Sequence, residues 1–299
     1  MAEMVPGLPP PLRATAEDLP PLVASALADP APPREDTVDA GGRSWHILEW
    51  GDTNDPPLVL IHGVTSNAET FWRVGPALSM TGRRVVAIDL PGHGRTGGWG
   101  GRHHFDDTSG EVAGVLRVAG HVQPDLDVLG HSWGAMVAAA LPRVGVRPRR
   151  LILLDPPAVT LSVLELMTTD PAERPYGTVA EAEAVMRSAN PGWSDGDIRA
   201  KALGLTQFEP KAVLDVLLKN GDWDGGVGAL GDPAADGIEV WLIRGEEATG
   251  SLTLDAAIGG FAARIGVDRV ITIAEGPHSP QRTHPEATTL AILRALGSA

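Results

Sequence analysis

The sequence predicts an α/β fold in which a mostly parallel, doubly wound β-sheet carries an inserted helical cap. Short apolar runs without polar alternation recur along the chain, which is typical of strands buried on both faces. Helix-length segments separate these runs, and this order predicts parallel strands joined by right-handed crossovers. The alternation stops over residues 156–236, where helical patterns alone continue. We therefore expect a layered α/β core and a helical insertion.

Residues 1–36 are expected to form a proline-rich strap ahead of the sheet. Proline fixes its own backbone angle and removes a hydrogen-bond donor, so most of this segment should be extended or mobile. One short helix is expected between Ala16 and Ala28.

The core is expected to occupy residues 37–155 and 237–299. It opens with a hairpin, because strand-like segments flank Ala40-Gly41-Gly42, which is a turn signal. Strands are expected over residues 37–39, 43–50, 58–61, 85–88, 127–129, 151–154, 238–243 and 269–273. Helices are expected over residues 69–80, 107–122, 133–144, 254–265 and 285–296.

The insertion, residues 156–236, is too long to be a connecting loop. Its helices are expected over residues 160–167, 179–188, 194–205 and 209–219. Because the insertion begins where one strand ends, we interpret it as a helical cap that lies over the carboxyl ends of the strands.

Composition limits the classes of function. The 299 residues carry a formal net charge of −14, which argues against a nucleic-acid partner. No apolar run approaches the roughly 18 residues of a membrane span, and the first residues lack the basic and apolar regions of a secretory signal. Cysteine is absent, which excludes disulfides, thiol nucleophiles and thiolate metal sites. A cytoplasmic location is the resulting expectation.

The segment Gly130-His131-Ser132-Trp133-Gly134 is the most informative motif. An apolar strand-like run precedes it and a small-residue helical pattern follows it. A serine at such a strand-to-helix turn exposes its hydroxyl beside a helix N-terminus, whose free N–H groups favour a developing negative charge. The flanking glycines let the backbone pass closely, because they have no Cβ atom. The motif predicts Ser132 as a nucleophile.

A serine nucleophile needs a base and donors for the oxyanion. His278 follows the last predicted strand and precedes the final helix, which places it at the same edge of the sheet as Ser132. The N–H group of Trp133 directly follows the nucleophile, and the loop after residues 58–61 presents the N–H group of Val64. These two groups are the candidate oxyanion hole.

Four motifs in this order resemble the α/β-hydrolase superfamily, in its cap-bearing branch. They are residues 58–63, 89–95, 130–134 and 276–279, and the resemblance covers roughly residues 37–297. It implies acyl transfer to water through an acyl-enzyme, without a metal or an organic cofactor. It also implies Ser132 as nucleophile, His278 as base, and Val64 and Trp133 as oxyanion donors.

The acidic partner of His278 has more than one candidate. Members of the superfamily usually carry G-x-x-D after the strand that follows the cap, but residues 245–248 end in Ala248. Other members carry the acid just before the cap, where this chain has Asp155. We favour Asp155, with Glu247 as the alternative acid and Glu246 third. Asp155 could instead cap the first turn of the insertion.

The candidate pocket residues are His62, Trp72, Met136 and Trp193. For His62, bracing of its loop by hydrogen bonding is favoured over a part in catalysis. For Trp72, packing of that loop is the default role and lining of the pocket is the lesser possibility. The indole of Trp133 is expected at the pocket wall. Together with the methionines and leucines of the cap, it favours a small, largely apolar ester or lactone as substrate.

The same resemblance leaves other activities open. Carbon–carbon bond hydrolases and cofactor-free haloperoxidases share this equipment, and the broken acid pattern keeps a ligand-binding protein with little turnover in view. The serine at position 132 argues against epoxide hydrolases and haloalkane dehalogenases, which the resemblance implies would carry aspartate there. The expected partner is a small-molecule substrate, with no nucleic acid and no membrane, and a homodimer is left open.

Overall fold

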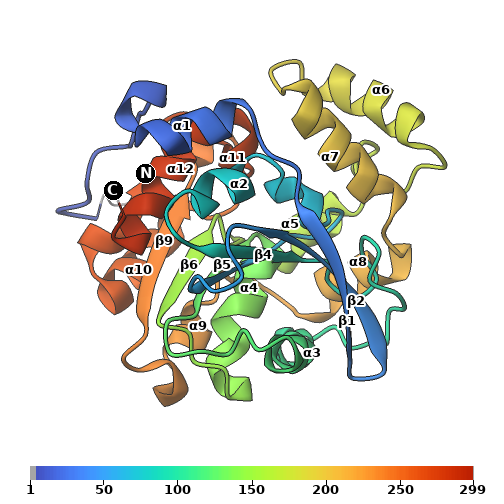
Figure 1. Cartoon of the computed structure of the whole chain (residues 1–299), viewed down its shortest axis with the longest axis horizontal. Coiled ribbons are helices and arrows are strands. Elements are labelled where there is room, and N and C mark those ends of the chain that lie inside the picture. The colour runs from blue at the N-terminus through green and yellow to red at the C-terminus, as the bar shows by residue number, and fades with distance from the viewer. Residues whose placement is uncertain (1–4, 299) are drawn as a thin grey trace.

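The computed structural model describes residues 5–298, in which eight strands form one sheet (Figure 1). The first two strands pair antiparallel with each other, and β2 pairs antiparallel with β4. All other neighbours are parallel, which confirms the predicted fold class. Across the sheet the strands are β1 (Arg34–Ala40), β2 (Arg43–Trp50), β4 (Arg84–Ile88), β3 (Pro57–Ile61), β5 (Asp127–His131), β6 (Arg150–Leu154), β9 (Glu239–Arg244) and β10 (Val270–Thr272).

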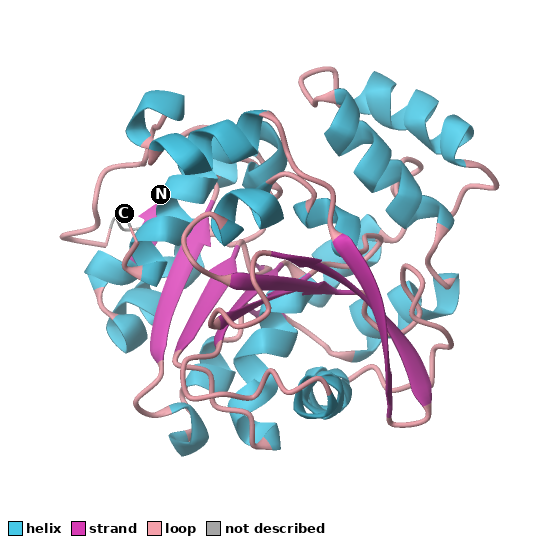
Figure 2. Ribbon diagram, viewed as in Figure 1, coloured by secondary structure: helices cyan, strands magenta, loops and turns pink. Residues whose placement is uncertain are grey.

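Helices cover both faces of this sheet, as Figure 2 shows by colour. One face packs against α1 (Pro21–Ala28), α2 (Val74–Ser79) and α12 (Pro285–Leu296). The other packs against α3 (Phe105–Val118), α4 (Trp133–Ala140) and α10 (Ile258–Ile265). Alternate residues of β3 divide between the two cores, with Val59 and Ile61 on one side and Leu58 and Leu60 on the other. The continuous apolar runs in the sequence follow from this double burial.

The chain between β6 and β9 is mainly helical. Its elements are α5 (Leu161–Met167), α6 (Val179–Ala189), α7 (Asp195–Thr206), α8 (Pro210–Lys219) and the short α9 (Val227–Leu230). The pair α6 and α7 stands beside the sheet at the upper right of Figure 1. A two-stranded antiparallel ribbon, β7 (Ala158–Val159) with β8 (Trp223–Asp224), closes the base of this segment and was not expected from the sequence. The boundaries of a cap domain stay a prediction.

Several predicted helices end early or divide, and prolines account for two of them. The segment 69–80 divides into a 3₁₀ turn, Ala68–Phe71, and α2, because Pro76 lies in the first turn of a new helix, where its missing N–H costs nothing. The segment 133–144 turns into a 3₁₀ helix from Leu141, because Pro142 cannot continue the hydrogen-bond ladder of α4.

The strap is more ordered than its composition indicated, although residues 1–4 lie outside the described part. The backbone of Leu12 bridges the chain just after β10, since Leu12 N donates to Thr272 O at 2.7 Å and Ala274 N donates to Leu12 O at 3.0 Å. Strand β1 begins at Arg34, within the predicted strap. None of the helices between residues 5 and 298 combines the length and apolar character that a bilayer crossing requires.

Candidate active site

Ser132 lies in a strained turn between β5 and α4. Its backbone has φ 57° and ψ −124°, a conformation that non-glycine residues rarely adopt. A Cβ atom at Gly130 would lie 2.2 Å from the Gly134 carbonyl oxygen, and one at Gly134 would lie 2.2 Å from the Ile61 carbonyl oxygen. Only glycine therefore fits at both flanking positions, and the two glycines allow the turn that presents the Ser132 hydroxyl.

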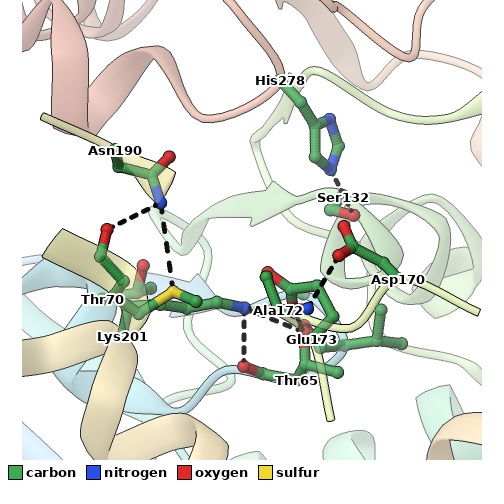
Figure 3. A network of polar contacts seen from close by, with 12 residues as sticks. Thr65, Thr70, Ser132, Asp170, Ala172, Glu173, Asn190, Lys201 and His278 are labelled. Carbon is green, nitrogen blue, oxygen red and sulfur yellow. Dashed lines mark hydrogen bonds and ion pairs between the residues drawn. The ribbon is translucent and has the colours of Figure 1, made fainter. Parts of the chain in front are cut away.

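Ser132, His278 and Asp155 form one continuous chain of hydrogen bonds. His278 Nε2 lies 2.9 Å from Ser132 Oγ, a contact that Figure 3 shows from close by. On the other side of the ring, Nδ1 lies 2.7 Å from Asp155 Oδ2. With the proton on Nδ1, the imidazole donates to the carboxylate and accepts from the hydroxyl, which is the arrangement a base requires. The structure thus brings together the three residues that the sequence favoured.

Asp155 is fully buried, and its carboxylate is saturated with donors. Besides His278, it accepts from Ser251 Oγ at 2.5 Å, from Gly245 N at 2.9 Å and from Leu252 N at 2.9 Å. Burial alone would raise the pKa of Asp155, but the hydrogen bonds from His278, Ser251 and Gly245 outweigh it and hold the pKa below its usual range. The carboxylate is therefore charged at neutral pH.

The alternative acids lie away from His278. Glu247 is exposed in the 3₁₀ turn Glu247–Thr249, and its Oε2 accepts from Asp255 N at 2.7 Å. Among residues 5–298, neither Glu247 nor Glu246 hydrogen-bonds to His278 through its side chain. The loop after β9 instead turns its backbone toward the site, and Gly245 N donates to Asp155.

The two expected oxyanion donors come from the residue directly after Ser132 and from the loop after β3. Trp133 is the first residue of α4, so its N–H group has no partner within that helix. The loop that carries Val64 passes close to the nucleophile, since a Cβ atom at Gly63 would lie 2.8 Å from Ser132 Cβ. Within the described chain, neither N–H group donates to another protein group. Both are free to donate to a ligand.

Buried side chains support the loop that carries Gly63 and Val64, which is the candidate oxyanion loop. His62 is fully buried, with Nδ1 2.7 Å from Gly63 O, and its Nε2 accepts from Leu90 N at 2.9 Å. Burial lowers the pKa of His62, so the ring is neutral and serves both bonds. Asp89 extends this support, because its Oδ1 accepts from Ala68 N at 2.7 Å. His62 thus braces the loop and does not line the cavity.

A second support reaches the same loop from α7. Lys201 Nζ donates to Thr65 O at 3.0 Å, to Thr65 Oγ1 at 2.9 Å and to Glu173 Oε2 at 2.5 Å (Figure 3). Thr65 Oγ1 also donates to Glu173. Burial lowers the pKa of Lys201 against the opposing effect of Glu173. This cluster follows from tertiary packing between distant segments, and no sequence signal indicated it.

A cavity of about 700 Å³ opens above Ser132 and His278. Its apolar lining includes Met167, Met186, Trp193, Phe208, Val213 and Leu217. Of the four predicted pocket residues, Trp193 lies in this lining.

The other predicted pocket residues lie elsewhere. Trp72 donates from Nε1 to Asp197 Oδ1 at 3.0 Å and packs on Gly196. Met136, on α4, is buried in the core between this helix and the sheet. The expectation that the indole of Trp133 forms the pocket wall is also wrong, because that ring is fully buried and packs against His93, with ring centroids 5.3 Å apart.

His131 contributes in a way that the sequence did not indicate. Its side chain lines the cavity, and its Nε2 lies 2.9 Å from the backbone oxygen of His278. Burial lowers the pKa of His131 to about 3, so the ring is neutral and donates this bond. The sequence shows that His131 directly precedes Ser132. It does not show where the side chain points, because that depends on the geometry of the turn.

Comparisons with known proteins agree with this architecture. A model of the alpha/beta hydrolase family matches residues 58–291. The dihydrolipoyllysine-residue acetyltransferase component of the acetoin cleaving system of Pseudomonas putida is 35% identical over 135 residues, which are 45% of this chain and 35% of that protein. A serine hydrolase-like protein of Dictyostelium discoideum is 31% identical over 126 residues, which are 40% of this chain and 32% of that protein. The chain thus spans about a third of the length of these curated relatives.

Among solved structures, the crystal structure of E-2-(acetamidomethylene)succinate hydrolase is similar with a TM-score of 0.74. The match covers 88% of this chain and 99% of that chain at 20% sequence identity. Likeness at this level of identity speaks for the fold alone.

Proposed function

The chain belongs to the alpha/beta hydrolase family, and we propose that it is a serine hydrolase that cleaves a small, largely apolar carboxylic ester or lactone through an acyl-enzyme. The observation that carries the proposal is the hydrogen-bond chain from Ser132 Oγ through His278 to Asp155. Two nearby backbone N–H groups, of Val64 and Trp133, donate to no protein group within residues 5–298, and the site opens into a mostly apolar cavity.

In the proposed reaction, Ser132 Oγ attacks the carbonyl carbon of the substrate while His278 Nε2 takes the hydroxyl proton. The Asp155 carboxylate stabilises the imidazolium that forms and keeps its orientation. Negative charge develops on the carbonyl oxygen, and the N–H groups of Val64 and Trp133 donate to it. A single donor of this kind contributes about 10²–10³-fold in rate.

The tetrahedral intermediate then collapses. His278 returns the proton to the leaving alcohol oxygen, and the acyl group stays on Ser132. A water molecule, deprotonated by His278, attacks the acyl carbon, and a second collapse releases the carboxylic acid and restores the serine hydroxyl. Both half-reactions use the same groups in the same positions.

The cavity supports a small substrate with apolar character. A volume of about 700 Å³ lies within the ordinary range for small-molecule sites. Flexible methionine side chains, Met167 and Met186, line it and can adapt to more than one acyl group. Two of the similar proteins are named as hydrolases or hydrolase-like, which is consistent with the proposal.

A panel of 4-nitrophenyl esters of increasing acyl length, together with a few lactones, tests the proposal. We expect turnover of short to medium acyl chains, with an initial burst of 4-nitrophenol when deacylation is slow. Ser132→Ala should abolish the burst, whereas the matched variant Ser162→Ala, at a serine on α5, should leave it intact. A folded protein that hydrolyses no ester and no lactone would contradict the proposal. That result would favour one of the alternative functions, which are carbon–carbon bond hydrolysis, haloperoxidase activity and ligand binding.

A further inference from the structure

Arg282 is a buried cation that lines the same cavity as Ser132 and His278. It lies in the short helix α11 (Pro280–Thr283), which directly follows the loop of His278, and it is 6% exposed. Its Nη2 donates to Thr70 Oγ1 at 2.9 Å. The ring of Trp193 covers one face of the guanidinium, with 4.8 Å between Arg282 Cζ and the ring centroid.

The buried guanidinium of Arg282 forms no ion pair with a carboxylate among residues 5–298. Its Nε is buried without a hydrogen-bond partner, and no carboxylate among residues 5–298 lies within 4.0 Å of it. Asp197 and Glu173 are the two acidic side chains whose charges raise the pKa of Arg282 against the stronger effect of burial, but both are already paired with other cations. Asp197 lies 3.1 Å from Arg73, and Glu173 lies 2.5 Å from Lys201. A buried charge is costly unless it is paired and hydrogen-bonded, so an anionic ligand would stabilise Arg282.

More cationic than anionic side chains line the cavity, although the whole chain is strongly acidic. Three cationic side chains, Arg174, Lys201 and Arg282, face two anionic ones, Asp170 and Glu173. Arg174 pairs with Glu181 at 3.0 Å. Arg282 is therefore the cation in this lining that has no carboxylate partner within the described chain.

We propose that Arg282 binds a carboxylate of the substrate, so that the ester or lactone cleaved at Ser132 carries a second, anionic acid group at some distance from the scissile bond. This inference rests on the proposed function. A planar guanidinium matches the geometry of a carboxylate, and a single guanidinium without a carboxylate partner suits a monoanion better than a phosphate dianion. Thr70 and Trp193 hold the guanidinium in place, and the bound carboxylate orients the scissile carbonyl toward Ser132.

Matched substrate pairs test this directly. The probes are 4-nitrophenyl half-esters of succinate, glutarate and adipate, each compared with the neutral 4-nitrophenyl ester of the same chain length, after subtraction of spontaneous hydrolysis. For at least one chain length, we expect the wild-type kcat/KM for the half-ester to exceed that for the neutral ester by about tenfold or more. A charge-assisted pair contributes roughly that factor. Equal rates, or a preference for every neutral ester, would overturn the proposal without any variant.

Variants assign the preference to Arg282. Arg282→Gln should reduce kcat/KM for the preferred half-ester at least tenfold more than for the neutral ester. Arg282→Lys should keep part of the preference, because it keeps the charge but not the planar geometry. Arg174→Gln, which removes a cavity cation that is already paired, should leave the preference unchanged. If Arg282→Gln lowers both rates equally, Arg282 has only a structural role.

A binding measurement separates this inference from the proposed function. Adipate, which has no scissile bond, should raise the melting temperature of the wild-type protein, and Arg282→Gln should lose that increase. If adipate stabilises the protein through Arg282 but the protein hydrolyses no ester, the proposed function is refuted and the carboxylate site is supported. Ester turnover that ignores charge, with no effect of adipate, would refute the site and keep the function.

Discussion

The side chain of His131 donates a hydrogen bond from Nε2 to the backbone oxygen of His278, across 2.9 Å. The neighbour of the proposed nucleophile thus fixes the backbone of the proposed base, and the two rings lie 5.0 Å apart. The bond ties the end of β5 to the loop after β10. These segments are far apart in the sequence, and their relative position sets the distance between Ser132 Oγ and His278 Nε2.

Loss of this bond should slow the chemical step. We predict that His131→Ala lowers kcat about tenfold or more and changes KM less, because a small displacement of His278 weakens its contact with Ser132. His131→Gln, whose amide can donate to the same oxygen, should restore part of the rate. Steady-state kinetics on one ester decide the matter, and an unchanged kcat in His131→Ala would contradict the positioning role.

Asp155 should be the acid on which turnover depends. We predict that Asp155→Asn lowers kcat by about 10³–10⁴-fold, because the neutral amide cannot stabilise the imidazolium and its NH2 group favours the wrong tautomer of His278. Glu247→Gln is the matched control and should stay close to wild type, since Glu247 contacts Asp255 N and not His278. Near-normal activity in Asp155→Asn together with an inactive Glu247→Gln would reverse this assignment.

The fold and the three residues of the hydrogen-bond chain could be predicted because their signals are local. Continuous apolar runs predicted the buried strands, and the glycines that flank Ser132 indicated a turn that only glycine permits. Asp155 was favoured because it ends a buried strand at the position where some members of the superfamily carry the acid, although the more usual pattern after β9 is broken at Ala248. The loop after β9 supplies a backbone donor in place of an acid, because Gly245 N donates to Asp155.

Lys201 should stabilise the fold as well as the oxyanion loop. We predict that Lys201→Met lowers the free energy of unfolding by about 2 kcal/mol, because it leaves Glu173 without its cation; the partial exposure of Glu173 keeps the effect below that of a fully buried pair. The double variant Lys201→Met with Glu173→Gln should recover much of the loss. Urea denaturation measures both, and additive losses in the double variant would contradict the pairing.

Stability should fall between pH 7.5 and pH 5. Burial lowers the pKa of His93 to about 3, and burial also lowers the pKa of His131 to about 3, whereas the unfolded chain takes up these protons near pH 6.5. In this window the unfolded state binds more protons, so stability rises with pH and is lost as pH falls. Each ring should cost about 2 kcal/mol by pH 5.

His93→Asn provides the control for this dependence. An asparagine can still donate to Pro91 O but does not titrate, so the difference in unfolding free energy between pH 7.5 and pH 5 should shrink by about 2 kcal/mol. Guanidinium denaturation at the two pH values measures it. An unchanged difference would show that His93 does not drive the pH dependence.

The pocket could not be predicted as well as the sheet, because it is built from contacts between distant segments. Trp72 and Met136 are large and close to the motifs in sequence, yet their side chains turn into packing against Asp197 and into the core. Arg282 and Lys201 carried no periodic or motif signal, and their importance follows only from what surrounds them. Side-chain direction in irregular segments depends on tertiary packing, which one sequence does not report.

Covalent labelling of the intact protein by a fluorophosphonate tests the central claim most directly. The reagent reacts with a serine whose hydroxyl is activated by a base and whose oxyanion is stabilised, so mass spectrometry should find one adduct per chain, on Ser132. Ser132→Ala should take up none, and Asp155→Asn should react far more slowly. A folded wild-type protein that stays unmodified, or that is modified at another residue, would contradict the account.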